Sequence, residues 1–233
     1  MDNSRGLSDS GIRQSLDFGE LKARQREIRD AFPPALALRT HRALSWLQRA
    51  EMEAARGDQD GRFLFLWIAF NAAYANEISD RRAFPERRLL LMFLNRLVDS
   101  DTENLLYGIV WRRYPTSIRL LIDNRFVFQP FWDYQNGSIG EADWKESFAR
   151  SKSSAHRALG RMDTKKVLAI AFDRLYTLRN QLIHGGATWN SSVNRSQVRD
   201  GAGILGDVVP VIIHLMMENP RQLWGDPCYP VVD

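Results

Sequence analysis

The sequence is poor in cysteine and in long apolar runs, and both shortages exclude classes of protein. Cys228 is the only cysteine in 233 residues, which rules out an internal disulfide and a zinc site built from several cysteines. The longest apolar run, Phe63–Ala75, is interrupted by Asn71 and is too short to span a bilayer. The opening residues, MDNSRGLSDSGIRQ, lack the apolar segment of a signal peptide. We therefore expect a cytoplasmic protein of bacterial type with no membrane association.

Lysine is also scarce, because only 5 of the 32 basic residues are lysines and 27 are arginines. The net charge is +4 and the isoelectric point is about 9.4. Arginine presents a planar fork that suits phosphate, whereas lysine offers a compact point charge. A GC-rich coding sequence would produce the same bias. The charge balance therefore permits a polyanionic partner without requiring one.

Several motifs that carry chemistry are missing. The chain has no glycine-rich phosphate loop, no H-E-x-x-H helix, no Ser–His–Asp arrangement and no pair of catalytic carboxylates. The sequence therefore gives no reason to expect a metal ion or a nucleotide cofactor.

What remains is a succession of helical patterns without the apolar/polar alternation of strands, which predicts an all-α bundle. Residues 1–33 are expected to be a polar extension with one helical stretch, and 34–219 to be the main helical domain. Within that domain, residues 124–161 are rich in aromatics, glycine and serine and show no sustained period. We expect them to form an irregular, loop-rich insertion with one short helix near EADWKESFARS. Residues 220–233 are expected to be an extended tail.

The clearest amphipathic helix covers residues 163–184, with Asp163 as its expected N-cap, and it contains a charge on its apolar side. At about 100° per residue, the apolar positions fall within about 40° of one line: Leu168, Phe172, Leu175 and Leu182. Arg179 falls near the middle of this stripe. Arginine stays protonated in proteins, and a buried charge must be paired or hydrogen-bonded. Arg179 is therefore expected either to pair with a buried acid or to serve a functional site.

The end of the same helix reads LRNQLIHGG. Asn180 and His184 are four residues apart and share a face, about 100° and 140° round from Arg179. Gly185 and Gly186 permit a left-handed helix cap, which places His184 where the helix unwinds. His184 is then either an ordinary cap residue or a catalytic one.

The Arg179–His184 segment resembles the R-x4-6-H motif of the HEPN superfamily, in which the residue after the arginine is usually polar and often asparagine. The buried helix GRFLFLWIAFNAAYA after a long amphipathic one is also similar to the opening helices of bacterial HEPN proteins. The resemblance covers roughly residues 34–219, although only the Arg179–His184 segment is specific. Two features depart from the family. Gly186 stands where HEPN toxins paired with a nucleotidyltransferase have a tyrosine, and residues 124–161 are not part of the minimal bundle.

The resemblance implies a homodimeric, metal-independent endoribonuclease acting as a toxin or antiphage effector. The RNA 2′-OH would attack the adjacent phosphate and leave a 2′,3′-cyclic phosphate and a 5′-OH. His184 would act as general base or acid, Arg179 would hold the phosphate and Asn180 would orient the phosphate or His184. The implied partners are RNA, with tRNA as one candidate, a second copy of the chain, and an antitoxin or regulator.

Further residues are candidates for supporting roles. Asn71 interrupts a buried helix and Tyr74 follows it by three residues, so both could support the Arg179 site. An amide such as Asn71 can equally just satisfy a neighbouring polar group. Arg150, His156 and Arg157 could contact RNA phosphates, or could simply lie in a solvated loop.

A second hypothesis is a catalytically silent HEPN-like module that dimerises or docks a partner. This module would need the apolar helix faces but not His184. A third is a regulatory nucleotide-binding domain, which would require a ligand pocket.

Overall fold

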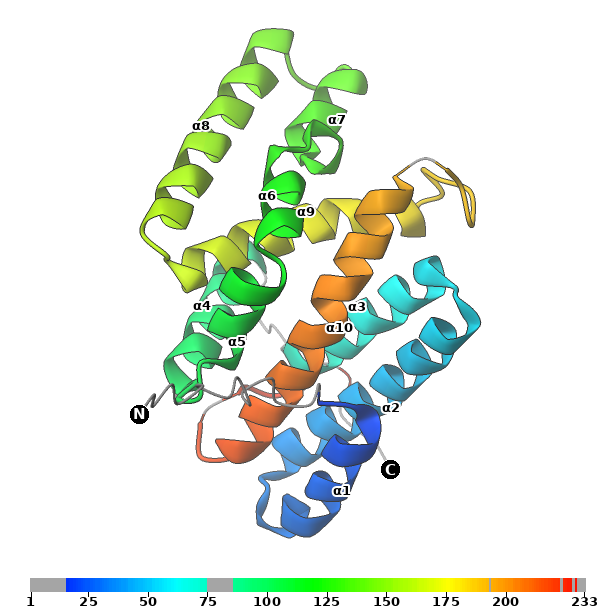
Figure 1. Ribbon diagram of the computed structural model, residues 1–233, viewed down its shortest axis with the longest axis vertical. Helices are drawn as coiled ribbons and strands as arrows, with labels where there is room; N and C mark the ends of the chain where they lie inside the picture. The colour runs from blue at the N-terminus through cyan, green and yellow to red at the C-terminus, as the bar shows by residue number, and fades with distance from the viewer. Residues whose placement is uncertain (1–15, 75–85, 193, 223, 228, 230–233) are drawn as a thin grey trace, which may run out of the picture.

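The described part of the chain folds as helices and connecting loops (Figure 1). The computed structural model describes residues 16–74, 86–192, 194–222, 224–227 and 229. In chain order its α-helices are α1 (Phe18–Ile28), α2 (Pro34–Arg56), α3 (Gln59–Tyr74), α4 (Glu86–Ser100), α5 (Leu105–Gly108), α6 (Pro115–Asp123), α7 (Gln129–Gln135), α8 (Glu141–Gly160), α9 (Thr164–Ile183) and α10 (Arg195–Glu218). Short helical turns lie at Arg29–Ala31, Ile109–Arg113 and Arg125–Val127. The all-α prediction is confirmed.

Helices α2 and α3 pack closely against each other and against α10. Gly57 ends α2 in the left-handed conformation, with φ of +76°. Helix α3 buries Phe63, Trp67 and Phe70, in keeping with its predicted all-round apolar character. The residues that directly follow Tyr74 lie outside the described part of the chain.

Helix α10 is one continuous helix of 24 residues, although it contains three glycines and Pro210. Gly201 has a packing reason, because a Cβ atom there would lie 2.9 Å from a methyl carbon of Leu175 and 3.0 Å from the Phe63 ring. By length and hydropathy α10 could cross a membrane. However, 72% of its apolar window is buried inside the fold, and core helices of globular proteins pass the same test.

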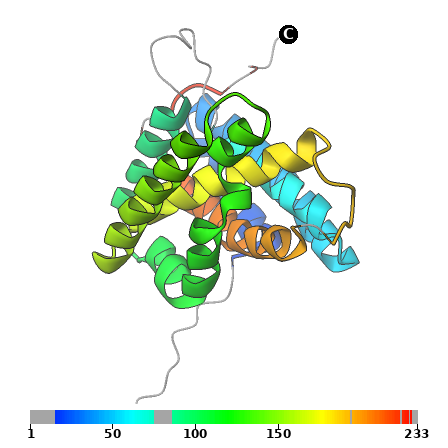
Figure 2. The same ribbon diagram turned by 90° about the horizontal axis from the view of Figure 1, so that it is seen from above.

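Helix α9 crosses the molecule between α8 on one side and α3 on the other (Figure 2). It also packs against α4 and α6. Leu168, Phe172 and Leu175 are each at most 1% exposed, so the predicted apolar stripe does face the core. The Asp163 carboxylate accepts a hydrogen bond from the Lys166 amide at 3.0 Å, which makes it the N-cap that the sequence predicted.

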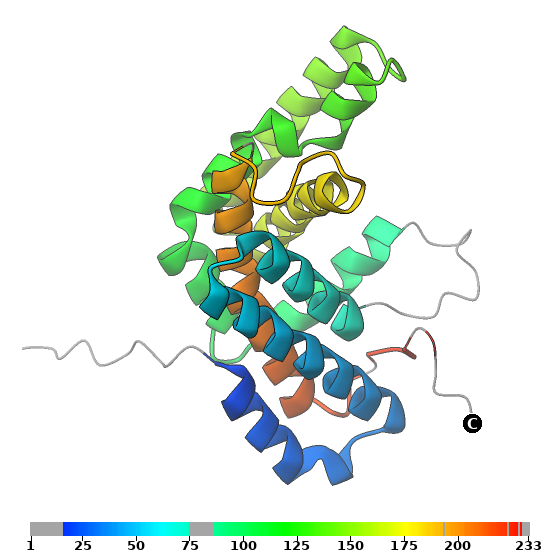
Figure 3. The same cartoon turned by 90° about the vertical axis from the view of Figure 1, so that its right-hand side faces the viewer.

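The prediction of an irregular insertion at residues 124–161 is wrong. The segment forms a short turn followed by α7 and α8, a helical hairpin that projects from the rest of the molecule (Figure 3). The hairpin has its own aromatic cluster, in which the ring centroids of Phe128 and Phe148 lie 5.1 Å apart and those of Phe131 and Trp144 lie 5.2 Å apart. The apolar stripe of α8 continues with alanine, which hydropathy patterns register weakly.

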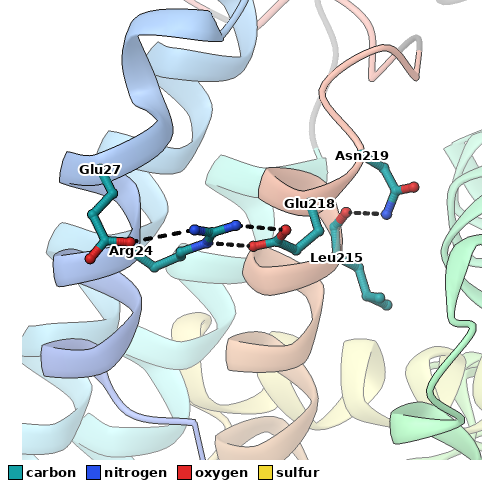
Figure 4. A network of polar contacts seen from close by, with 5 residues as sticks. All are labelled: Arg24, Glu27, Leu215, Glu218 and Asn219. Carbon is teal, nitrogen blue, oxygen red and sulfur yellow. Dashed lines mark hydrogen bonds and ion pairs between the residues drawn. The ribbon is translucent and has the colours of Figure 1, made fainter.

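The N-terminal helix α1 fulfils the predicted helical stretch and packs against α2 and α10. Leu21 is 1% exposed, and Arg24 donates two hydrogen bonds, of 2.8 and 3.1 Å, to the Glu218 carboxylate at the end of α10 (Figure 4). These bonds lower the pKa of Glu218. The described part of the expected N-terminal extension is therefore packed on the bundle, while residues 1–15 lie outside the description.

The described residues of the C-terminal tail lie outside any helix, and Arg39 fastens them to the bundle. This arginine is fully buried and donates hydrogen bonds to the main-chain oxygens of Ala73, Gly225 and Asp226, at 2.7 to 3.1 Å. Trp224 is 4% exposed, so the tail adds a side chain to the core.

Candidate functional site

The motif segment forms the C-terminal end of α9, and its backbone follows the predicted cap. His184 is the residue after the helix, with φ of −90° and ψ of 12°, and its amide donates to the Asn180 carbonyl at 3.0 Å. Gly185 adopts the left-handed conformation with φ of +71°, which glycine accepts without strain. The Gly186 amide then donates to the Gln181 carbonyl at 2.7 Å. His184 thus lies where regular helix ends.

Arg179 is partly buried beside two aromatic rings. The carbon at the centre of its guanidinium lies 5.9 Å from the Trp67 ring centroid and 5.4 Å from that of Tyr176. Its Nη1 donates to the Asn180 side-chain oxygen at 2.8 Å. Its Nε is buried and has no hydrogen-bond partner among the described atoms.

Within the described part of the chain, Arg179 forms no ion pair with a carboxylate. The expected buried acid is therefore not seen there. The contrast with Arg174, five residues earlier on α9, is clear. Arg174 is fully buried, donates to the Ser151 hydroxyl at 2.8 Å and lies 3.4 Å from an oxygen of the Asp173 carboxylate. Arg179 has a neutral amide where Arg174 has an acid.

The His184 side chain is exposed, and no described residue forms a hydrogen bond with its imidazole. Asn180 lies one turn earlier, is partly buried, and connects Arg179 with His184. Its side-chain oxygen accepts a hydrogen bond from Arg179, and its main-chain carbonyl accepts one from the His184 amide. The three predicted catalytic residues therefore stand on adjoining faces of one helix end, with the imidazole open to solvent.

The two predicted supporting residues on α3 differ in their surroundings. Asn71 is partly buried one turn after Trp67, and its side chain forms no hydrogen bond to a described residue. Tyr74 is 8% exposed, and its ring stacks on Phe70 at 5.3 Å and lies 5.5 Å from Phe93 of α4. Tyr74 is thus a residue of the aromatic core. The residues that do flank Arg179, Trp67 and Tyr176, were not singled out from the sequence.

The three predicted RNA-binding residues lie on α8, and each contacts a neighbouring side chain. Arg150 pairs with Glu146, and Arg157 donates to the Ser153 hydroxyl at 2.8 Å. His156 lies 3.4 Å from a carboxylate oxygen of Asp123 on α6. All three are exposed, but they belong to a regular helix rather than to a loop.

The loop that follows His184 is fastened to the first turn of α3, a contact that sequence patterns could not indicate. Asp60 is 5% exposed, and one of its oxygens accepts from the Asn190 amide at 2.7 Å and from Arg195 at 2.9 Å. The Asn194 side chain donates to the Gln181 side chain at 2.9 Å. These bonds restrain the loop at Asn190 and at its junction with α10.

A cavity of about 550 Å³ lies elsewhere, between the hairpin and the bundle. Its walls come from α4, α7, α8 and α9, and include Asp133, Ser151, Lys166 and Asp173. None of the predicted catalytic residues lines it. In the described part of the chain, no group of three His, Cys, Asp or Glu residues is placed to hold a metal ion.

Comparison with known proteins does not identify a relative. The chain matches no protein-family model, no curated protein and no solved structure. Function must therefore be argued from the geometry at the end of α9.

Proposed function

We propose that the protein is a metal-independent endoribonuclease whose site is formed by Arg179, Asn180 and His184. The observation that carries this proposal is the state of Arg179. A guanidinium that is partly buried beside aromatic rings, and that has only an amide for a partner, incurs a desolvation cost that nothing in the described chain offsets with opposite charge. A phosphodiester would supply that charge and the acceptor oxygens.

The chemistry needs two proton transfers and one site of charge stabilisation. A neutral imidazole removes the proton from the RNA 2′-OH, whose oxygen forms a bond to the adjacent phosphorus. The bond from phosphorus to the 5′-oxygen breaks, and an imidazolium gives its proton to that oxygen. The products are a 2′,3′-cyclic phosphate and a 5′-OH. Histidine suits both transfers near neutral pH, and Arg179 holds the negative charge that develops on the phosphate oxygens.

One chain offers one histidine at this site, so we place the second on another copy of the chain. The surface of α9 supports a symmetric contact. Tyr176 is 37% exposed and Ile183 is 51% exposed, and they are seven residues apart on the same helix face. A twofold pairing of this face would cover both side chains and bring two His184 residues to one cleft.

The proposed activity suits one class of biological role. An endoribonuclease that cuts a cell's own RNA without restraint harms that cell. The proposal is therefore a toxin or antiphage effector acting on RNA, tRNA included, and held in check by an antitoxin or other regulator.

The test is RNA cleavage in EDTA by the wild-type protein and by Arg179→Ala and His184→Ala. Removing either group should lower the rate by about 100-fold or more, because each transfers a proton or holds the phosphate. His41→Ala and Arg199→Ala, at exposed positions on α2 and α10, are the matched controls and should cut normally. If both site variants cut as fast as wild type, the proposal is wrong.

The exposed Tyr176 and Ile183 also favour a second candidate, a catalytically silent module that docks through α9. One experiment distinguishes the endoribonuclease from the silent docking module. A silent module keeps its partner in the His184→Ala variant and loses it in Ile183→Asp, and neither protein nor variant cuts RNA.

A further inference from the structure

Trp189 is an unusually exposed aromatic residue on the loop that begins at His184. It is 74% exposed, whereas Trp67, Trp144 and Trp224 are at most 7% exposed. The loop joins α9 to α10, and Trp189 comes five residues after His184, so the two lie within about 18 Å even if the chain between them is extended. An indole held in water at this place needs an explanation.

The position of this indole is fixed despite its exposure. Its Nε1 donates to a carboxylate oxygen of Asp58 at 3.2 Å, and the other oxygen of Asp58 accepts from the Gly61 amide at 2.9 Å. The next residue, Asn190, binds the buried Asp60 through its amide. The ring is thus tethered by its edge, and an exposed fraction of three quarters leaves at least one face open.

The surroundings of Trp189 do not suit a protein interface. Within three residues of it the chain carries the polar Thr188, Asn190, Ser191 and Ser192 and the small Gly186 and Ala187, so the loop beside the ring adds no large apolar side chain. Stable protein contacts use contiguous apolar patches with polar rims. A single ring with a free face and a fixed edge is instead suited to stacking on one flat group.

We propose that Trp189 stacks on an unpaired base of the RNA substrate, a few nucleotides from the phosphate held by Arg179. This inference rests on the proposed function and names its substrate class, which is single-stranded RNA or an unpaired loop. Stacking on aromatic side chains is the usual way in which proteins bind unpaired bases, and it tolerates any base. A base inside a duplex cannot reach the ring without leaving its own stack.

The test measures binding of a fluorescent single-stranded RNA oligonucleotide to the full-length His184→Ala protein, which cannot consume the probe. Trp189→Ala in this background should weaken binding by about 5- to 150-fold, the range for loss of one stacked base. Trp189→Phe should recover most of the affinity, because it restores a ring. Trp46→Ala, which removes an exposed tryptophan of α2, should bind as the parent does.

An abasic scan makes the assignment specific. Bases of the oligonucleotide are removed one at a time, and one abasic position should weaken binding to the Trp189 parent while leaving the Trp189→Ala protein unaffected. Equal losses at every position for both proteins would overturn the inference. So would a Trp189→Ala protein that binds RNA normally but fails to dimerise in sedimentation, because the ring would then contact a second copy.

The outcomes also separate this inference from the nuclease proposal. If the wild type cuts RNA and Trp189→Ala binds and cuts equally well, stacking is wrong and the nuclease stands. If the protein binds RNA through Trp189 without cutting it, stacking stands and the nuclease falls. If it neither binds nor cuts RNA, both are wrong.

Discussion

At the scale of single residues, two arginines of this protein show how the same side chain serves structure or site. Arg39 donates to three main-chain oxygens and fastens the tail. Arg179 has one amide acceptor and two rings beside it. The main-chain oxygens around Arg39 satisfy its guanidinium within the chain, whereas the guanidinium of Arg179 keeps donors that could bind an anion.

This difference predicts opposite effects of the same substitution. Arg179→Met removes a poorly compensated charge and keeps the volume, so the free energy of unfolding should stay equal or rise by about 0.5–1 kcal/mol, while RNA cleavage is lost. Arg39→Met leaves buried carbonyls unpaired and should destabilise by about 2 kcal/mol or more. Urea denaturation measures both. A fall of 1 kcal/mol or more for Arg179→Met would make Arg179 a structural residue.

Two carboxyl groups predict opposite responses to pH. Burial raises the pKa of Asp207, against the opposing effects of Arg113 and Tyr114, whereas hydrogen bonds from Arg24 lower the pKa of Glu218. A raised folded pKa gives stability that is present at acid pH and is lost as the pH rises through it. A lowered one gives stability that is present at neutral pH and is lost on acidification.

The free energy of unfolding of Asp207→Asn, relative to that of wild type, should therefore be higher at pH 7 than at pH 4. The free energy of unfolding of Glu218→Gln, relative to that of wild type, should be lower at pH 7 than at pH 4. Denaturation midpoints at the two pH values check both signs, and a shift of both variants in the same direction would contradict this account.

At the scale of elements, the end of α9 depends on one backbone conformation. Gly185 has φ of +71° with no atom within 4 Å of a Cβ position, so an added methyl group is strained but not crowded. Gly185→Ala should cost about 1 kcal/mol of stability and should also displace His184, lowering cleavage by 10-fold or more. Gly137, between α7 and α8, has φ of +74° and equally open surroundings. Gly137→Ala should lose similar stability and keep full activity. If both variants cut RNA equally fast, the left-handed cap at Gly185 is not needed to position His184.

Local signals in the sequence were enough to predict much of this element. Asp163 and Gly185 act on backbone groups within a few residues, so the bounds of α9 and the place of His184 could be foreseen. Helix α8 could not, because its stripe runs from Trp144 and Phe148 into small residues that pack closely on α9. The rings beside Arg179 and the Asp60 contact with the loop join distant parts of the chain, which no local pattern encodes.

At the scale of the whole molecule, the proposed site requires a second copy of the chain. Ile183→Asp places a charge on the exposed face of α9 without touching the core. It should convert the dimer to a monomer in sedimentation and abolish cleavage, although the monomer stays folded. Leu120→Asp, at a residue of α6 that is 62% exposed, is the control and should remain dimeric. An active Ile183→Asp monomer would exclude a site shared between two chains.

The most direct measurement uses a DNA oligonucleotide that contains a single ribonucleotide, incubated with the protein in EDTA. We expect one cut, immediately after the ribonucleotide, with a 2′,3′-cyclic phosphate on one fragment and a 5′-OH on the other, and no cut by His184→Ala. Cleavage of the all-DNA control, or equal cleavage by His184→Ala, would contradict the proposed mechanism.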